Sequence, residues 1–150
     1  EVNRLLNGML YRSTTTARYA TLFFALYDAD RRLLSYSNAG HFPPLHIARN
    51  GEVARLGADG MPLGLFEDAT YGQAQRTLAP GDLLVLYTDG IVEAQGTDGV
   101  EFGEARFIEL LSRHRDADLD DLVLRIMAEL ERWGGGHSHD DATLVLARVS

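Results

Sequence analysis

The stretch from Leu83 to Ala94 limits the fold more than any other part of the sequence. Four consecutive apolar residues run directly into Tyr87-Thr88, and the pair Asp89-Gly90 follows at once. A continuous apolar run of this length predicts a strand that is buried on both faces. A carboxylate at the exit of such a strand is held in place by a rigid element, where a binding site can use it. Asp89 is therefore a candidate site residue, and its alternative role is that of a plain turn residue, because Asp-Gly is first of all a turn signal.

The composition is that of one globular domain of 150 residues, with 45% hydrophobic and 24% charged residues. The net charge of −8 disfavours attraction to nucleic acid or to an anionic membrane surface, so we expect neither as a partner. The chain has no cysteine, which excludes disulfides, thiolate catalysis and cysteine-based zinc sites and fits a reducing compartment. No apolar run reaches transmembrane length. We therefore expect a cytoplasmic protein.

The hydrophobic pattern predicts one unit dominated by antiparallel hairpins, with two helices late in the chain. The first helix should carry one apolar face made of Val2, Leu5, Leu6, Met9 and Leu10. A strand over 19–27 should be buried, and Asn50-Gly51 favours a hairpin closed by a type I′ turn. In chain order, we expect helices over 1–12, 102–114 and 119–133, a hairpin over 45–56, and strands over 19–27, 33–37, 70–78, 83–87 and 143–149.

The pair Asp140-Asp141 stands immediately before the last predicted strand. Adjacent carboxylates repel each other unless solvent or a cation relieves the repulsion, so an exposed polar loop is one interpretation. The other interpretation pairs Asp140 with Asp89, because both lie at ends of predicted core strands. Convergent carboxylates suit hard cations such as Mg²⁺ or Mn²⁺, and such a metal can activate water for hydrolysis.

Other constellations in the sequence are weaker. His137 and His139 could bind zinc, but alternate residues of an extended segment point to opposite sides. We expect His41 to hydrogen-bond local backbone and Glu93 to be a solvated carboxylate rather than a metal ligand. The sequence contains no nucleophile elbow, P-loop or dinucleotide-type glycine motif.

Several motifs occur together in a fixed order, and as a set they are far more specific than any one of them. The chain resembles the bacterial branch of metal-dependent PPM-type (protein phosphatase 2C-like) serine/threonine phosphatases, which includes stage II sporulation protein E and the phosphatases that regulate stress-response sigma factors. The resemblance covers essentially the whole chain and rests on Asn3-Arg4-Leu5-Leu6, Asn38-Ala39-Gly40-His41, Pro43-Pro44, Pro62-Leu63-Gly64, Pro80-Gly81-Asp82, Tyr87 to Ala94, Phe102-Gly103 and Asp140 to Leu144.

This resemblance implies an α+β fold, an αββα sandwich of two antiparallel sheets packed face to face and flanked by helices. It also implies a site for two Mn²⁺ or Mg²⁺ ions, where water attacks a phosphoserine or phosphothreonine. Asp89 and Asp140 match metal-binding aspartates of the family, and Asp141 takes the neighbouring position. The implied substrate is a phosphorylated regulatory protein such as an anti-sigma factor antagonist, and an upstream sensor or receiver domain is the implied regulator.

The sequence also departs from the family. The Gly-Asp-x-x-Asp-like and Asp-x-x-Gly-x-Gly motifs, which supply further metal ligands, do not occur in it. We therefore expect residues 1–150 to be a single PPM-type domain that lacks its N-terminal metal-binding segment. Such a chain should be inactive or nearly so by itself, and its uncovered sheet edges and apolar faces should favour a homodimer.

Two functions of different classes follow from these observations. The first is a Mn²⁺- or Mg²⁺-dependent protein phosphatase whose site is completed by upstream sequence. The second is a catalytically inactive protein-binding module in sigma-factor or two-component signalling. Acidic metal-binding motifs upstream of Glu1 would favour the enzyme.

Overall fold

The computed structural model describes residues 1–13, 18–57, 60–135 and 142–150 of the chain. These residues form two compact units. The first unit comprises Glu1–Pro43 and Leu56–Ala79, and the second comprises Pro44–Arg55 and Pro80–Ser150. The candidate residues Asp140 and Asp141 lie outside the described residues, as do His137 and His139.

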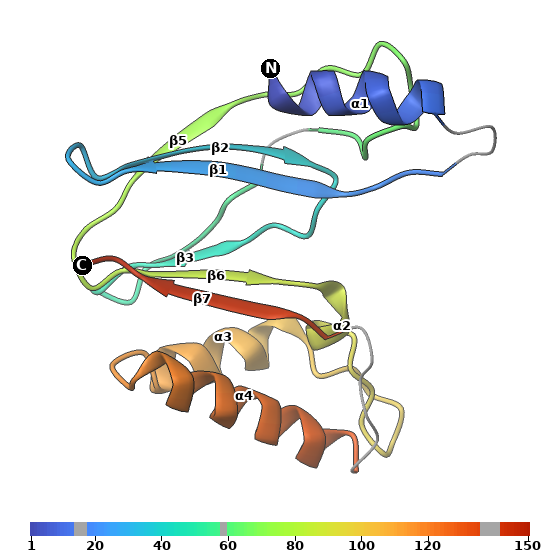
Figure 1. Ribbon diagram of the computed structural model, residues 1–150. Helices are drawn as coiled ribbons and strands as arrows, with labels where there is room; N and C mark the ends of the chain where they lie inside the picture. Colours follow the sequence, from blue (N-terminus) through green and yellow to red (C-terminus); the bar gives the residue numbers. More distant parts are fainter. Residues whose placement is uncertain (14–17, 58–59, 136–141) are drawn as a thin grey trace. The chain divides into compact units, whose positions relative to one another are not determined.

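The first unit is built on a three-stranded antiparallel sheet with the order β1-β2-β5, and helix α1 lies beside it (Figure 1). The prediction of a buried strand over 19–27 is wrong in its burial: no residue of β1 is fully buried, and Leu26 is 63% exposed. The reason is position, because β1 is an edge strand of this sheet and pairs only with β2 among the described strands. The elements of this unit are α1 (Val2–Ser13), β1 (Leu22–Asp28), β2 (Leu33–Ala39) and β5 (Ala74–Thr77).

Helix α1 is present as predicted, but its apolar face is turned to solvent. Leu5 is 54% exposed and Met9 64%, whereas the buried residues of the helix are Asn3 and Asn7. Tertiary hydrogen bonds account for this orientation. Asn7 Nδ2 donates to the carbonyl oxygens of Phe66 (2.9 Å) and Glu67 (3.1 Å).

The same Asn7 side chain also accepts two hydrogen bonds through Oδ1. The donors are the Gly64 N–H at 2.7 Å and the Tyr71 hydroxyl at 3.0 Å. A single buried amide thus holds the 64–71 segment against α1. Burial also raises the pKa of Tyr71 above its ordinary value of 10.0, so the hydroxyl is a donor throughout the neutral range.

The second unit contains a four-stranded antiparallel sheet with the order β4-β3-β6-β7. Strand β6 is central and pairs with both β3 and β7, and helices α3 and α4 lie side by side on one side of the sheet (Figure 1). The elements of this unit are β3 (Leu45–Ile47), β4 (Val53–Arg55), β6 (Leu83–Tyr87), α2 (Asp89–Val92), α3 (Glu104–Arg113), α4 (Leu119–Trp133) and β7 (Leu144–Arg148).

The core of the second unit lies between the sheet and its two helices. Residues that are at most 2% exposed come from both layers, and Tyr87 packs its ring 4.8 Å from that of Phe107 on α3. Strand β6 differs from the prediction of burial on both faces. Leu83, Val85 and Tyr87 are fully buried, whereas the intervening Leu84 and Leu86 are only partly buried, because β6 alternates between the helix-covered face and the opposite one.

The hairpin predicted at Asn50-Gly51 is present as β3 and β4, but its turn is of another type. Gly51 has φ of 91°, whereas Asn50 does not have the positive φ that a type I′ turn requires at both central residues. The Gly51 N–H donates to the Ala48 carbonyl at 2.8 Å, and the Ala48 N–H donates to the Glu52 carbonyl at 2.8 Å. This is the pattern of a three-residue loop with a glycine bulge.

The α+β class with two antiparallel sheets and accompanying helices is confirmed. The described residues between positions 57 and 66 contain no strand, apart from the isolated bridge between Ala20 and Leu63. None of the helices in the described ranges combines the length and hydropathy needed to cross a bilayer.

Candidate functional site

Asp89 is the first residue of the short helix α2 and directly follows the central strand through Thr88. The side chain is exposed, and its Oδ1 accepts the Gly90 N–H at 3.0 Å. The Glu93 N–H donates to the Asp89 carbonyl at 2.8 Å, which closes the single turn of α2. A fixed backbone thus presents a carboxylate whose remaining lone pairs face solvent.

Thr88 ties the end of β6 to the chain that enters β7. Its N–H donates to the Thr143 carbonyl at 3.1 Å, and its Oγ1 accepts the Thr143 N–H at 2.9 Å. These two hydrogen bonds extend the β6–β7 ladder by one residue beyond Tyr87 and Leu144. The backbone immediately before Asp89 is therefore held to the segment that enters β7.

The residues present fit part of a metal site. A carboxylate oxygen is a ligand that Mg²⁺ and Mn²⁺ prefer, so Asp89 suits either ion. Over 1–13, 18–57, 60–135 and 142–150, no three histidines or acidic residues come together in a way that could hold a metal ion. Glu93 is exposed, as expected of a solvated carboxylate, and Asp140 lies outside these ranges.

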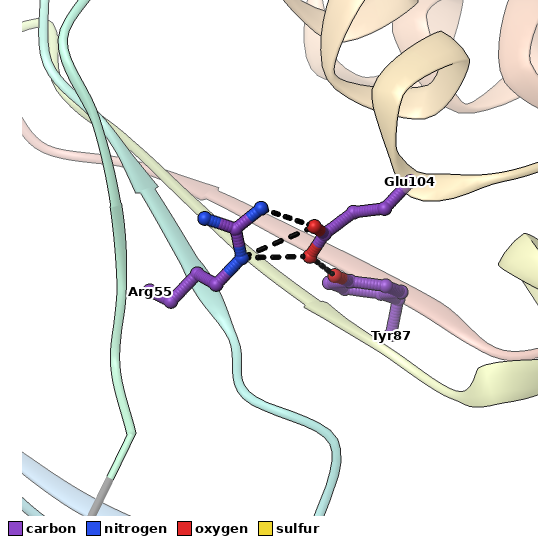
Figure 2. A network of polar contacts seen from close by, with 3 residues as sticks. All are labelled: Arg55, Tyr87 and Glu104. Carbon is purple, nitrogen blue, oxygen red and sulfur yellow. Dashed lines mark hydrogen bonds and ion pairs between the residues drawn. The ribbon is translucent and has the colours of Figure 1, made fainter.

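A polar network on the helix side of the sheet joins three elements at the end of β6, and Figure 2 shows its members. The Tyr87 hydroxyl donates to Glu104 Oε1 at 2.9 Å, and Arg55 Nε lies 3.1 Å from both carboxylate oxygens of Glu104. Arg55 Nη2 also donates to Glu104 Oε2. The network connects the edge strand β4, the central strand β6 and the first turn of α3.

Hydrogen bonds and burial shift the pKa values of all three residues of this network. The hydrogen bond from Arg55 lowers the pKa of Glu104, despite the opposing effect of partial burial. The hydrogen bonds that Arg55 donates to Glu104, and the negative charge of that carboxylate, raise the pKa of Arg55. Burial, followed by the Glu104 contact, raises the pKa of Tyr87, so its hydroxyl remains protonated. The network therefore fixes Tyr87, two residues before Asp89.

A second buried polar pair lies in the same sheet, between β3 and the residue that precedes β6. His46 Nε2 and Asp82 Oδ2 are 2.7 Å apart, and their side chains are 3% and 4% exposed. Asp82 Oδ1 also accepts the Arg49 N–H at 2.9 Å. This arrangement anchors the Pro80-Gly81-Asp82 turn to β3, which is a structural role.

Sequence reasoning missed both the Arg55–Glu104–Tyr87 network and the His46–Asp82 pair. Their partners are 49, 17 and 36 residues apart, so neither hydrophobic periodicity nor motif spacing connects them. The expectation for His41 is confirmed: its Nδ1 lies 2.7 Å from the Phe42 carbonyl oxygen, and its N–H donates to Asn38 Oδ1 at 2.8 Å.

Comparison with known proteins identifies the family of the chain. The family profile described as stage II sporulation protein E (SpoIIE) matches residues 1–150. The chain is 29% identical over 150 residues to the phosphoserine phosphatase RsbU of Bacillus subtilis, an alignment that covers 99% of this chain and 44% of RsbU. The chain spans less than half the length of the curated relatives it matches.

Solved structures show the same fold. The PP2C phosphatase domain with a regulatory-domain fragment of SpoIIE from Bacillus subtilis matches with a TM-score of 0.79 at 25% identity, covering 95% of this chain and 42% of that one. A manganese-presoaked SpoIIE phosphatase domain from the same organism matches with a TM-score of 0.72 at 23% identity, covering 98% and 63%. The profile match extends over the whole chain, so the protein belongs to the stage II sporulation protein E family.

Proposed function

We propose that residues 1–150 are the C-terminal part of one PPM-type catalytic domain of a metal-dependent protein serine/threonine phosphatase. The observation that carries the proposal is Asp89, an exposed carboxylate fixed at the exit of the central strand in a chain whose whole length matches the SpoIIE family. RsbU, which bears the name phosphoserine phosphatase, supports the reaction class. The domain boundary and the assignment of the site residues are parts of this proposal.

In this proposal Asp89 and Asp140 are metal ligands for Mn²⁺ or Mg²⁺, with two ions in the complete domain. When bound, the metal supplies activation of water for attack on a phosphomonoester. The residues of this chain supply position. Thr88 fixes the Asp89 backbone to Thr143 immediately before β7, and the Tyr87–Glu104–Arg55 network holds the end of β6 to helix α3 and strand β4.

The proposed substrate is a phosphorylated anti-sigma factor antagonist or a similar phosphoprotein in the cytoplasm, with an upstream sensor or receiver domain as regulator. The name phosphoserine phosphatase of RsbU supports a phosphorylated protein as substrate, and the regulatory domain of SpoIIE from Bacillus subtilis supports a regulatory domain. The net charge of −8 argues against nucleic acid or an anionic membrane as the target.

A second candidate is a protein-binding module that keeps the fold without the chemistry. It is favoured by one observation: the described residues bring no three metal-binding side chains together. In either case we propose that the 150-residue chain by itself is inactive or nearly so.

Manganese-dependent release of phosphate from a phosphoserine protein tests the enzyme, measured on the chain extended by its native upstream sequence. Asp89→Asn should abolish the release, because the amide replaces a charged metal ligand. Asp30→Asn, at an exposed turn residue outside the site, is the matched control and should retain it. Full activity in Asp89→Asn would refute the metal assignment.

Calorimetry tests the incompleteness of the site in the 150-residue chain. Titration with Mn²⁺ should show weak binding or none, because no three histidines or acidic residues in the described part of the chain come together in a way that could hold a metal ion. Micromolar affinity would mean that the site is more complete than proposed. Loss of that binding in Asp89→Asn would then place the ion at Asp89.

A further inference from the structure

A groove of about 520 Å³ runs between α3 and α4 in the second unit. It is formed by the outer sides of the helices, since their inner sides are packed in the core through residues such as Phe107, Leu111 and Ile126. We propose that this groove binds an acidic peptide segment of a partner protein. The proposal does not depend on the phosphatase activity, because none of the groove residues belongs to the site at Asp89.

The charge of the groove is opposite to that of the chain. Its lining includes Arg106, Arg113, Arg125 and Arg132, which are four of the fourteen basic residues, but only two of the twenty-two acidic ones, Glu109 and Glu129. The chain as a whole carries −8. Four guanidinium groups along one groove form a local positive field, and their planar donors match carboxylates in bidentate geometry.

Two of these arginines are available to an incoming carboxylate. Arg125 is exposed and makes no ion pair with any residue that the structure describes. Arg106 donates to the carbonyl oxygens of Glu101 (3.2 Å) and Phe102 (2.9 Å), and it has no carboxylate partner in the described part of the chain. Both side chains thus keep guanidinium donors for a ligand.

The other two arginines are held by weak pairs. Arg113 bonds Glu109 at 2.6 Å, but the two side chains are 63% and 67% exposed. Arg132 pairs with Glu129 one turn away on α4. Exposed ion pairs of this kind contribute about 1 kcal/mol or less, so a multivalent acidic ligand can replace them.

One end of the groove is rigid and aromatic. The Trp133 ring lies 5.8 Å from Phe102 in an edge-on arrangement, and its Nε1 donates to the Val100 carbonyl at 3.2 Å. Arg106 lies 4.5 Å from the centre of the Trp133 ring. This surface offers apolar contact beside the arginines, which favours a peptide that carries both acidic and apolar side chains over a free anion.

The charge of the chain also disfavours nucleic acids and anionic membranes as ligands of the groove. A nucleic acid or an anionic membrane presents charge over an area far larger than the groove and would meet the acidic remainder of a chain with net charge −8. A short acidic peptide can occupy the groove without that repulsion.

Trp133 provides the test, because it is the only tryptophan of the chain. Its fluorescence is measured during titration of the 150-residue protein with a glutamate-rich dodecapeptide that contains two leucines, and with the matched glutamine-rich peptide. We expect a saturable change with the acidic peptide and none with the neutral one. Arg125→Gln should weaken binding about threefold and Arg125→Glu about tenfold, since an exposed ion pair is lost in the first and replaced by repulsion in the second.

Arg31→Gln is the control, because Arg31 is an exposed arginine in the β1–β2 turn of the other unit. It should bind the acidic peptide as the unmodified chain does. Equal responses to the two peptides, equal weakening by Arg31→Gln and Arg125→Gln, or tighter binding of a single-stranded oligonucleotide of the same charge would each overturn the proposal.

Discussion

Helices α1 and α4 both carry apolar residues at helical spacing, yet they bury opposite kinds of side chain. Helix α4 buries Leu122, Ile126 and Leu130 against the rest of its unit. Helix α1 buries Asn3 and Asn7 and leaves Leu5 and Met9 in solvent. Amphipathic spacing therefore predicts that a helix forms, but the partners available in the tertiary structure decide which face is buried.

The energetic basis differs in the same way. The buried face of α4 is stabilised by apolar area removed from water. The buried face of α1 depends on four hydrogen bonds to one amide, and an unsatisfied buried polar group is costly. The following substitutions separate these two kinds of stabilisation.

The largest effect is expected in α4. Ile126→Ala should lower the free energy of unfolding by about 3 kcal/mol, because it leaves a cavity at a fully buried position. Urea unfolding followed by circular dichroism measures the change. Leu124→Ala is the matched control, since Leu124 is 67% exposed on the same helix and should cost less than 0.5 kcal/mol.

The next effect is expected at the buried face of α1. Asn7→Ala should cost about 2 kcal/mol, because it leaves the Gly64 N–H and the carbonyls of Phe66 and Glu67 without their partner. Asn3→Ala should cost less, since Asn3 donates only to Ser37 Oγ at 3.0 Å and its Oδ1 has no hydrogen bond to a described residue. Equal losses of unfolding free energy in the two variants would contradict the role given to the four hydrogen bonds of Asn7.

A smaller effect is expected from pH at the Arg55–Glu104–Tyr87 network. The pKa of Glu104 is lower in the folded chain than its ordinary value of 4.5, so folding favours the ionised carboxylate. This contribution is fully present above pH 4.5 and is lost as the pH falls through the lowered pKa.

Glu104→Gln should therefore flatten the dependence of unfolding free energy on pH below 4.5. At neutral pH the loss should stay at about 1 kcal/mol or less, because the Arg55 side chain of the pair is 56% exposed. Urea titrations at several pH values measure both quantities. An unchanged pH profile in this variant would show that Glu104 does not titrate as described.

The smallest effect is expected on the exposed face of α1. Leu5→Gln should change the free energy of unfolding by less than about 0.5 kcal/mol, because the side chain is already 54% exposed. Thermal unfolding of this variant and of Leu122→Gln, which places an amide in the core, gives the contrast. A large loss in Leu5→Gln would mean that its face is covered in solution, and light scattering would then identify a dimer.

Much of the fold could be predicted from local pattern. The predicted helix over 119–133 coincides with α4, and the strand over 83–87 coincides with β6, because both have strong periodicity or a continuous apolar run. The hairpin was predictable from Asn50-Gly51, but its turn type was not, since the loop length is set by the register of β3 against β4.

The candidate site was predictable only in part. Asp89 lies where a strand exit predicted it, and its role as a metal ligand stays a prediction, as does that of Asp140. The residues that hold β6 in place were not predictable, because Tyr87 meets Glu104 and Arg55 only through the packing of α3 and the pairing of β4. Tertiary contacts of this kind leave no periodic trace in a single sequence.

The central position of β6 also determines how its backbone amides exchange with solvent. The ladder to β7 runs along all of β6, and the ladder to β3 covers Leu83 to Val85, so the amides of these three residues should exchange with deuterium only when the whole unit opens. Strand β1 has a described neighbour on one side alone and should exchange through local fraying. Asp89 thus follows a strand that should exchange slowly, so a ligand that binds there should meet a backbone that is already ordered.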